Sequence, residues 1–194
     1  CVGGGTGGSI LERTTAGRKQ LTTIDFPDVT DLNSLHGSGD VVTAVGSSGT
    51  VMVSTDFGTT WDLTSGMPGT TIYALQFPTA TNGFGAGFDG LFIRTTNGGN
   101  SWKASFAYAN HLSPNFNDMH FLNGTTGLAV GSYRVALKTT DGGAHWSQMY
   151  KDTTAAAVTF YGARMVDENL AFMVGQLSTT NGAIYKTTDG GANW

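Results

Sequence analysis

Three aspartates of this sequence stand beside serine or threonine hydroxyls, a pairing that acid–base or nucleophilic chemistry uses. Asp56, Asp141 and Asp189 each follow two hydroxyl residues and precede a glycine and a tryptophan. A carboxylate at hydrogen-bond distance from a hydroxyl can act as its general base. One catalytic site needs one such pair, however, whereas this phrase recurs along the chain. We therefore interpret the phrase as structural and predict that none of its residues is catalytic.

A recurring base is also missing beside the hydroxyls. His145 occupies a position that holds another residue type in the other copies, namely Thr60, Ser101 and Asn193. A retaining glycosidase needs two carboxyl groups about 5–5.5 Å apart. Asp89 with Asp118 or Asp152 could form such a pair, but nothing in the sequence selects them. The sequence therefore predicts a protein that is not an enzyme, with a glycoside hydrolase as the alternative.

The phrase recurs with a period of about 40 to 50 residues. Its copies are STDFGTTW at 54–61, TTNGGNSW at 95–102, TTDGGAHW at 139–146 and TTDGGANW at 187–194, with a worn copy, TTAGRKQL, at 14–21. The repeat units therefore end near Leu21, Trp61, Trp102, Trp146 and Trp194. Propeller blades and helical repeats both have periods of this length, so the content of each period decides between them.

Each period contains four short apolar runs that are typical of strands. The first run is exemplified by IYALQF, and the second ends in glycine (TAVG, GLAVG). The third directly precedes the phrase (LFIR, VALK), and the fourth begins at the tryptophan. Gly, Asn, Asp or Pro separates the runs, and no segment keeps a helical period. The sequence therefore predicts an all-β fold: a single β-propeller over residues 1–194, built of four-stranded antiparallel blades. We expect about five blades, with incomplete blades at both ends.

The phrase suits the hairpin between the third and fourth strands of a blade. Its Asp or Asn can accept hydrogen bonds from the backbone of the turn, and the glycine two residues later supplies a positive φ. The tryptophan is expected to bury a large surface between blades. The predicted structural residues are Asp56, Gly58, Trp61, Asn97, Gly99, Trp102, Asp141, Gly143, Trp146, Asp189, Gly191 and Trp194.

Two forms of the phrase resemble those of known propeller families. The run S-T-D-x-G-x-T-W at 54–61 resembles the Asp-box of bacterial neuraminidase-repeat propellers. The longer form G-x-ϕ-ϕ-K-T-T-D-G-G-x-x-W, after a strand ending in A-V-G, resembles the photosystem II stability and assembly factors and their bacterial relatives. This resemblance covers essentially the whole chain and implies a non-catalytic propeller that binds a protein partner as an assembly or surface-interaction module. Because glycosidases also contain Asp-boxes, the alternative is part of an extracellular glycoside hydrolase or carbohydrate-binding propeller.

The loops opposite the Asp-boxes are the expected binding face. The alternation of strand direction places the Asp-boxes on one face of the blades. The loops from second to third strand, and the links between blades, then lie on the other face. Loops on a rigid scaffold often carry binding residues, and exposed aromatic side chains suit protein or sugar contacts. The candidate binding residues are Phe88, Asp89, Tyr108, His111, Tyr133, Arg134 and Gln176.

Two further repeat positions carry polar or charged residues. Gln76, His120 and Arg164 share a position on the first strand, which is expected to line the central channel of a propeller. A position on the third strand holds cations, which we interpret as a blade surface position. Its residues are Arg13, Arg94, Lys138 and Lys186.

Composition argues against several partners and cofactors. The formal net charge is −4, and no cluster of Lys or Arg is present, which argues against binding of nucleic acid or anionic membranes. The histidines show no metal-ligand spacing, and no glycine-rich run lies between a strand and a helix. No apolar run is long enough to span a bilayer. We therefore expect no cofactor, no metal and no transmembrane segment.

The single cysteine, Cys1, allows two interpretations. It cannot form an intrachain disulfide. It is either part of a strand in an incomplete blade or the lipidated first residue of a bacterial lipoprotein with a glycine-rich tether. Both interpretations agree with an extracytoplasmic location, which we expect. Because both ends interrupt a blade, we also expect an open arc or a larger assembly rather than a closed ring.

Overall fold

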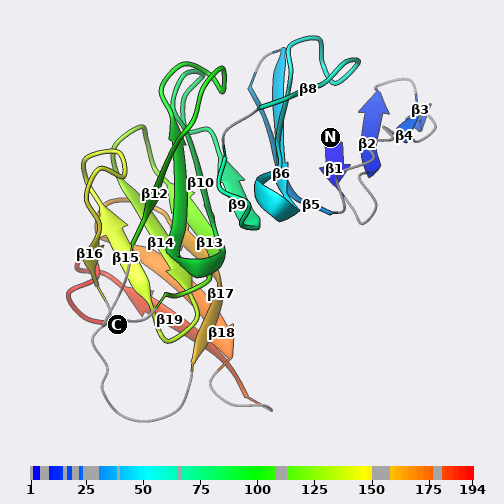
Figure 1. The fold of residues 1–194 in the computed structure, drawn as a ribbon. Helices are drawn as coiled ribbons and strands as arrows, with labels where there is room; N and C mark the ends of the chain where they lie inside the picture. Colours follow the sequence, from blue (N-terminus) through cyan, green and yellow to red (C-terminus); the bar gives the residue numbers. More distant parts are fainter. Residues whose placement is uncertain are drawn as a thin grey trace.

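A computed structural model gives the fold as a series of antiparallel sheets (Figure 1). It describes residues 31–38, 40–64, 67–107, 113–149, 158–176 and 181–194, and the backbone of residues 2–4, 9–14, 17–18 and 22–23. Cys1, Leu21, Tyr108, His111 and Asp152 lie outside the described residues. Within these ranges, no helix has the length and apolar character needed to cross a membrane.

Four sheets have four strands each, and in three of these every strand pairs antiparallel with its neighbour in sequence. The all-β class and the four-stranded antiparallel blades predicted from the sequence are therefore confirmed. These blades consist of β5 (Leu32–Ser38), β6 (Val41–Gly46), β7 (Val51–Ser54) and β8 (Asp62–Leu63); β9 (Ile72–Gln76), β10 (Gly83–Gly87), β11 (Leu91–Thr95) and β12 (Lys103–Phe106); and β13 (Phe116–Phe121), β14 (Gly127–Gly131), β15 (Ala136–Thr139) and β16 (Ser147–Gln148).

A further sheet flanks this series on each side. The first contains β1 (Val2–Gly4), β2 (Ser9–Thr14), β3 (Gly17–Arg18) and β4 (Thr22–Thr23), and the last contains β17 (Thr159–Met165), β18 (Ala171–Gln176) and β19 (Gly182–Thr187). Figure 1 shows the sheets following one another in chain order around an open arc. The blue β1–β4 sheet and the orange β17–β19 sheet lie at its opposite ends.

Apolar side chains fill the spaces between neighbouring blades. Phe84 and Phe121 come from adjacent blades and stack with their ring centroids 3.8 Å apart. Phe92 and Phe116 meet in the same interface at 4.4 Å, and all four rings are buried. Full burial of such a side chain stabilises a fold by about 1.5–3 kcal/mol. The inner strands β10 and β14 are buried at every position, because a blade covers each of their faces.

Polar side chains tie the first strand of one blade to the first strand of the next. The Gln76 amide donates from Nε2 to the Phe121 carbonyl at 3.0 Å and accepts at Oε1 from the Phe121 N–H at 2.7 Å. His120 Nδ1 accepts from the Met165 N–H at 3.3 Å. These bonds give Gln76 and His120 a role between blades that the sequence pattern did not indicate. Their side chains satisfy the open backbone edge of the next first strand, which pairs on its other edge only.

Burial at these junctions shifts the pKa values of two ionisable groups in opposite directions. The pKa of His120 is lowered by loss of hydration and, secondarily, by the positive charge of Arg164. Burial also raises the pKa of the Asp118 carboxyl, although Asp118 Oδ2 accepts from the Ala163 N–H at 2.8 Å. Both shifts favour the neutral form of the group. The junctions therefore use neutral or hydrogen-bonded side chains.

Candidate functional site

A buried hydroxyl closes each of the four described Asp-box hairpins. In one of them, Thr139 Oγ1 accepts from the N–H groups of Gly143 at 2.9 Å and Asp141 at 3.3 Å, and donates to Asp141 Oδ1 at 2.9 Å. No hydrogen-bonding role was predicted for this hydroxyl, although Ser or Thr occupies the position in each copy. The corresponding residues are Ser54, Thr95 and Thr187, which make the same bonds and are also buried.

The Asp-box carboxylates bind their own turns. Asp141 Oδ1 accepts from the His145 N–H at 2.9 Å, and Asp56 Oδ1 accepts from the Thr60 N–H at 2.8 Å. These backbone bonds are the largest reason why the pKa of each carboxyl falls to about 2. Asn97 Oδ1 accepts the equivalent bond from Ser101 at 3.0 Å. A carboxylate that is satisfied in this way is a weak general base at neutral pH.

The Asp-box tryptophans lie at the blade interfaces. Trp146 stacks on Phe92 of the preceding blade with ring centroids 4.4 Å apart, and its edge meets Phe121 of its own blade at 6.0 Å. Trp102 packs edge-on against Phe77 at 5.6 Å. The Trp61 indole Nε1 donates to the Gly58 carbonyl at 3.0 Å. Each of these side chains is partly buried, so the hairpin and the interface share one aromatic ring.

The loops between second and third strands are tight turns on the face opposite the Asp-boxes. Two of them are 3₁₀ turns, η1 (Ser47–Gly49) and η2 (Phe88–Gly90), and both end in a glycine with positive φ. The third turn places Arg134 at the position of these glycines with φ 59°, directly after Tyr133 at φ 57°. Two consecutive left-handed residues without glycine are uncommon, so this turn departs from its own repeat.

Asn115 joins η2 to the turn that contains Tyr133. Its side-chain Oδ1 accepts from the Asp89 N–H at 3.2 Å, its own N–H donates to Ser132 Oγ at 2.9 Å, and its carbonyl accepts from the Ser132 N–H at 3.0 Å. Arg134 N–H then donates to the Val158 carbonyl of the next link at 2.9 Å. These bonds join η2, the turn that contains Tyr133 and the link at Val158 into one hydrogen-bonded row.

Four of the candidate binding residues belong to the turns of this row. Phe88 and Tyr133 are 46% and 55% exposed. Asp89 and Arg134 belong to the same two turns. Gln176 lies at the end of β18, where its Oε1 accepts from the Tyr161 hydroxyl at 3.3 Å. Tyr108 and His111 are outside the described residues, and their place on this face stays a prediction.

The family of this chain follows from its repeats. A family model described as photosynthesis system II assembly factor YCF48 matches residues 67–194. The chain belongs to this family. The resemblance predicted from the Asp-box phrases is thus confirmed. A search of the curated proteins finds no match.

Solved structures of this family and of glycosidases share the fold. YCF48 bound to a D1 peptide is 30% identical, with a TM-score of 0.55, over 63% of this chain and 39% of that chain. YCF48 from Cyanidioschyzon merolae is 14% identical, with a TM-score of 0.60, over 83% and 58%. The GH74 xyloglucanase from Xanthomonas campestris is 15% identical, with a TM-score of 0.70, over 96% and 33%.

This YCF48-family chain spans between about a third and three-fifths of the length of these three structures. The similarity to the xyloglucanase, at 15% identity, shows a common fold alone. In the described residues of the chain, no three His, Cys, Asp or Glu side chains gather as metal ligands would. Asp118, one of the carboxylates considered for a glycosidase pair, is engaged by the Ala163 N–H of the next blade.

One repeat position has a different role from the one its sequence pattern indicated. Arg94 Nη1 donates to the Gly142 carbonyl at 3.0 Å, and Lys138 Nζ donates to the Gly190 carbonyl at 3.1 Å. Both acceptors belong to the Asp-box of the following blade. These cations are therefore clamps between blades and not merely surface residues. The signal in the sequence was a cation directly before the first Ser or Thr of the Asp-box phrase. This cation recurs in every copy except the one at 54–61, where Val53 replaces it.

Proposed function

We propose that this chain is a non-catalytic assembly module that binds a segment of a protein partner. The observation that carries the proposal is its place in the YCF48 family, together with the 30% identical relative that was solved with a D1 peptide. The chain would use its loop face, where exposed aromatic side chains project from hydrogen-bonded turns. Aromatic side chains of this kind often dominate the energy of protein contacts.

The turn at Tyr133 supports the choice of this face. Residues other than glycine in the left-handed region cost about 1–3 kcal/mol each and are kept mainly where a function needs them. Tyr133 and Arg134 both carry this cost. In η1 and η2 only the first of the two positions does, at Ser48 and Asp89, and the second position is Gly49 or Gly90. The strained turn presents an aromatic and a cationic side chain next to each other.

A glycoside hydrolase or a carbohydrate-binding propeller is the second candidate. It is favoured by the shape that the chain shares with the GH74 xyloglucanase. The proposal of a non-catalytic module expects no release of sugar from xyloglucan. Turnover that disappears in Asp89→Ala would replace the first proposal with this one.

The decisive experiment is calorimetric titration of the chain with a synthetic D1 peptide. We expect binding, and we expect Phe88→Ala and Tyr133→Ala each to raise Kd at least about ten-fold, as loss of an aromatic anchor does. Phe57→Ala is the matched control, because Phe57 is an exposed aromatic residue with positive φ in an Asp-box hairpin on the other face. Absence of binding, or equal effects of Phe57→Ala and Tyr133→Ala, would overturn the proposal.

A further inference from the structure

Two blade junctions are closed by a long cation and a bulky apolar side chain. At the junction after β9–β12, Arg94 reaches the Gly142 carbonyl, and Phe84, which pairs with Arg94 across the sheet, is buried. At the junction after β13–β16, Lys138 reaches the Gly190 carbonyl, and its cross-strand partner is buried Leu128. A β-carbon on Gly142 would lie 3.9 Å from Arg94 Nη1 and 4.0 Å from Phe84, and one on Gly190 would lie 3.3 Å from Lys138 Nζ.

The junction after β5–β8 lacks both parts of this arrangement. Val53 replaces the cation and Thr43, its cross-strand partner, replaces the bulky apolar residue. A β-carbon on Gly99 of the next Asp-box would lie 3.4 Å from Thr43 Oγ1 and 3.6 Å from Val53 Cγ2. The Val53 side chain has no donor for the Gly98 carbonyl, which corresponds to the acceptors Gly142 and Gly190. In the described part of the chain, the buried Thr43 hydroxyl has no hydrogen-bond partner.

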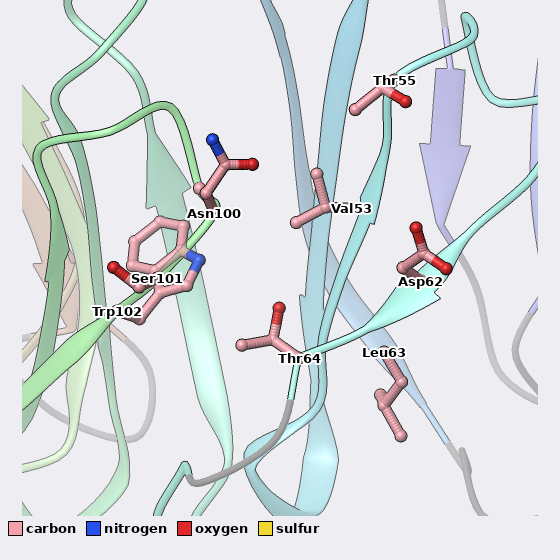
Figure 2. A pocket seen from close by; sticks show the side chains of 9 residues that line it. Val53, Thr55, Asp62, Leu63, Thr64, Asn100, Ser101 and Trp102 are labelled. Carbon is pink, nitrogen blue, oxygen red and sulfur yellow. The ribbon is translucent and has the colours of Figure 1, made fainter.

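A groove of about 490 Å³ lies at this junction. Figure 2 shows Val53 and Thr64 on the β7–β8 side and Asn100, Ser101 and Trp102 on the opposite side. The remaining lining residues are Thr55, Asp62, Leu63 and Gly99. Its volume is within the range of about 300–1,000 Å³ that is usual for ligand sites. Val53, which stands in the place of the longer cation, is one of the lining residues.

The chemistry of the lining suits a cation with an apolar stem. Asp62 is the one charged residue among those that line the groove, and it is negative. Thr64 and Asn100 add oxygen acceptors, while Val53 and Trp102 supply apolar surface. Lys and Arg side chains combine an aliphatic stem with a cationic head, and an indole attracts such a head. An anion would meet Asp62 without a compensating cation in the lining.

We propose that this groove binds a Lys or Arg side chain of a partner polypeptide. The incoming cation takes the place that Arg94 and Lys138 fill at the other junctions, and it donates to the Gly98 carbonyl and to Asp62. The molecule itself provides the precedent, because cations of the chain bind the equivalent carbonyl in two other Asp-boxes. The site lies between blades, beside the Asp-boxes, and does not depend on the peptide site proposed for the loop face.

The test is a titration followed by ¹H–¹⁵N NMR spectra of the chain, with the blocked tripeptides Gly-Arg-Gly and Gly-Lys-Gly as probes. We expect saturable shifts centred on Val53, Gly98 and the Trp102 indole. Blocked Gly-Leu-Gly and Gly-Glu-Gly should leave these signals unchanged. Equal shifts with the leucine or glutamate peptide, or no shift with the cationic peptides, would overturn the proposal. A response to xyloglucan oligosaccharides alone would assign the groove to carbohydrate and would overturn it too.

Two variants distinguish binding in the groove from general charge attraction. Val53→Arg restores the internal clamp, so it should abolish the shifts and raise the melting temperature. Asp62→Asn, at an exposed position, should weaken binding at least about three-fold while the fold is retained. Thr140→Arg adds the same charge at an exposed site in another blade and is the matched control, which should bind as the unchanged chain does. Unaltered binding in both Val53→Arg and Asp62→Asn would show that the groove is not the site. Binding of the D1 peptide should be unaffected by either variant, so failure of this proposal is distinct from failure of the loop-face proposal.

Discussion

Gln76 and Phe121 exchange two hydrogen bonds across a blade junction, one through each polar atom of the glutamine side chain. The residues are far apart in sequence, and each is the last residue of the first strand of its blade. The glutamine thus acts as a short piece of strand that pairs with the open edge of its neighbour. This relationship makes the junction sensitive to a single side chain.

Replacement of this side chain should destabilise the fold. Gln76→Leu leaves the N–H and C=O of Phe121 without their partner, and each unsatisfied group costs about 1–3 kcal/mol. We expect a loss of about 2–4 kcal/mol in the free energy of unfolding, measured with urea. Gln76→His is the conservative control, since His36 and His120 fill this position in the blades on either side. It should restore part of the loss. A change below about 0.5 kcal/mol for Gln76→Leu would contradict the role of the bonds.

Protonation of His120 should weaken the next junction. Burial lowers the pKa of His120 from the ordinary value of 6.5, so the folded state favours neutral imidazole. The corresponding stability is present above about pH 6.5 and is lost as the pH falls through the lowered pKa.

His120→Gln should therefore reduce the loss of stability between about pH 7.5 and pH 5, because Gln76 shows that an amide fits this position. Part of the loss should remain, since burial also lowers the pKa of His36. Urea unfolding at both pH values is the measurement. An unchanged pH dependence in His120→Gln would refute the assignment.

The Asp-box hydroxyl should matter more than the hydroxyl next to it. Thr139→Val keeps the shape but removes the acceptor of two N–H groups and the donor to Asp141. We expect a cost of about 2–3 kcal/mol. Thr140→Val changes an exposed hydroxyl and should stay within about 0.5 kcal/mol. Thermal unfolding of both variants provides the comparison, and similar effects would contradict the hairpin role.

The sequence allowed the hairpins to be located because local backbone geometry requires their residues. Gly99 and Gly143 have φ of 93° and 76°, a region where glycine is favoured, and Asp or Asn must lie four residues before the N–H that it binds. These requirements act within eight residues, so they leave a visible repeat. The hydroxyl of Thr139 also recurs in each copy for a local reason. Because Thr and Ser are also common at an ordinary strand end, their recurrence gave no separate signal.

The contacts between blades could not be read in the same way. Gln76 meets Phe121, and Arg94 meets Gly142, only because consecutive sheets stack at a particular angle. A polar residue at a repeat position is equally compatible with a wet channel or with an open strand edge. The importance of Val53 depends on knowing what Arg94 binds. Its replacement of a cation is visible in the sequence, but the resulting groove is not.

A glycine at the end of the second strand should be required for close approach of the backbone. A β-carbon on Gly131 would clash with the carbonyl oxygen of Asn115, which also accepts from Ser132. Gly131→Ala should therefore cost about 2–3 kcal/mol through overpacking. Gly69→Ala is the control, because a β-carbon there would meet nothing within 4 Å. Urea unfolding should separate the two variants, and equal stability would contradict the steric argument.

The outer face of the β17–β19 sheet should make the chain associate with itself. Val174 and Ile184 are paired across this sheet and are 44% and 77% exposed. Val130 and Ala136, the equivalent pair in the preceding blade, are fully buried under the next sheet. Exposed apolar surface of this kind favours association, and the open arc in Figure 1 leaves it uncovered.

We expect sedimentation velocity of the 194-residue chain to show species larger than a monomer, in a proportion that rises with concentration. Ile184→Glu should shift the population toward the monomer, because association would bury an unpaired charge. Phe57→Glu, at another exposed apolar residue in an Asp-box hairpin, should leave the association unchanged. A single monomeric species at every concentration would show that the exposed sheet face does not drive assembly.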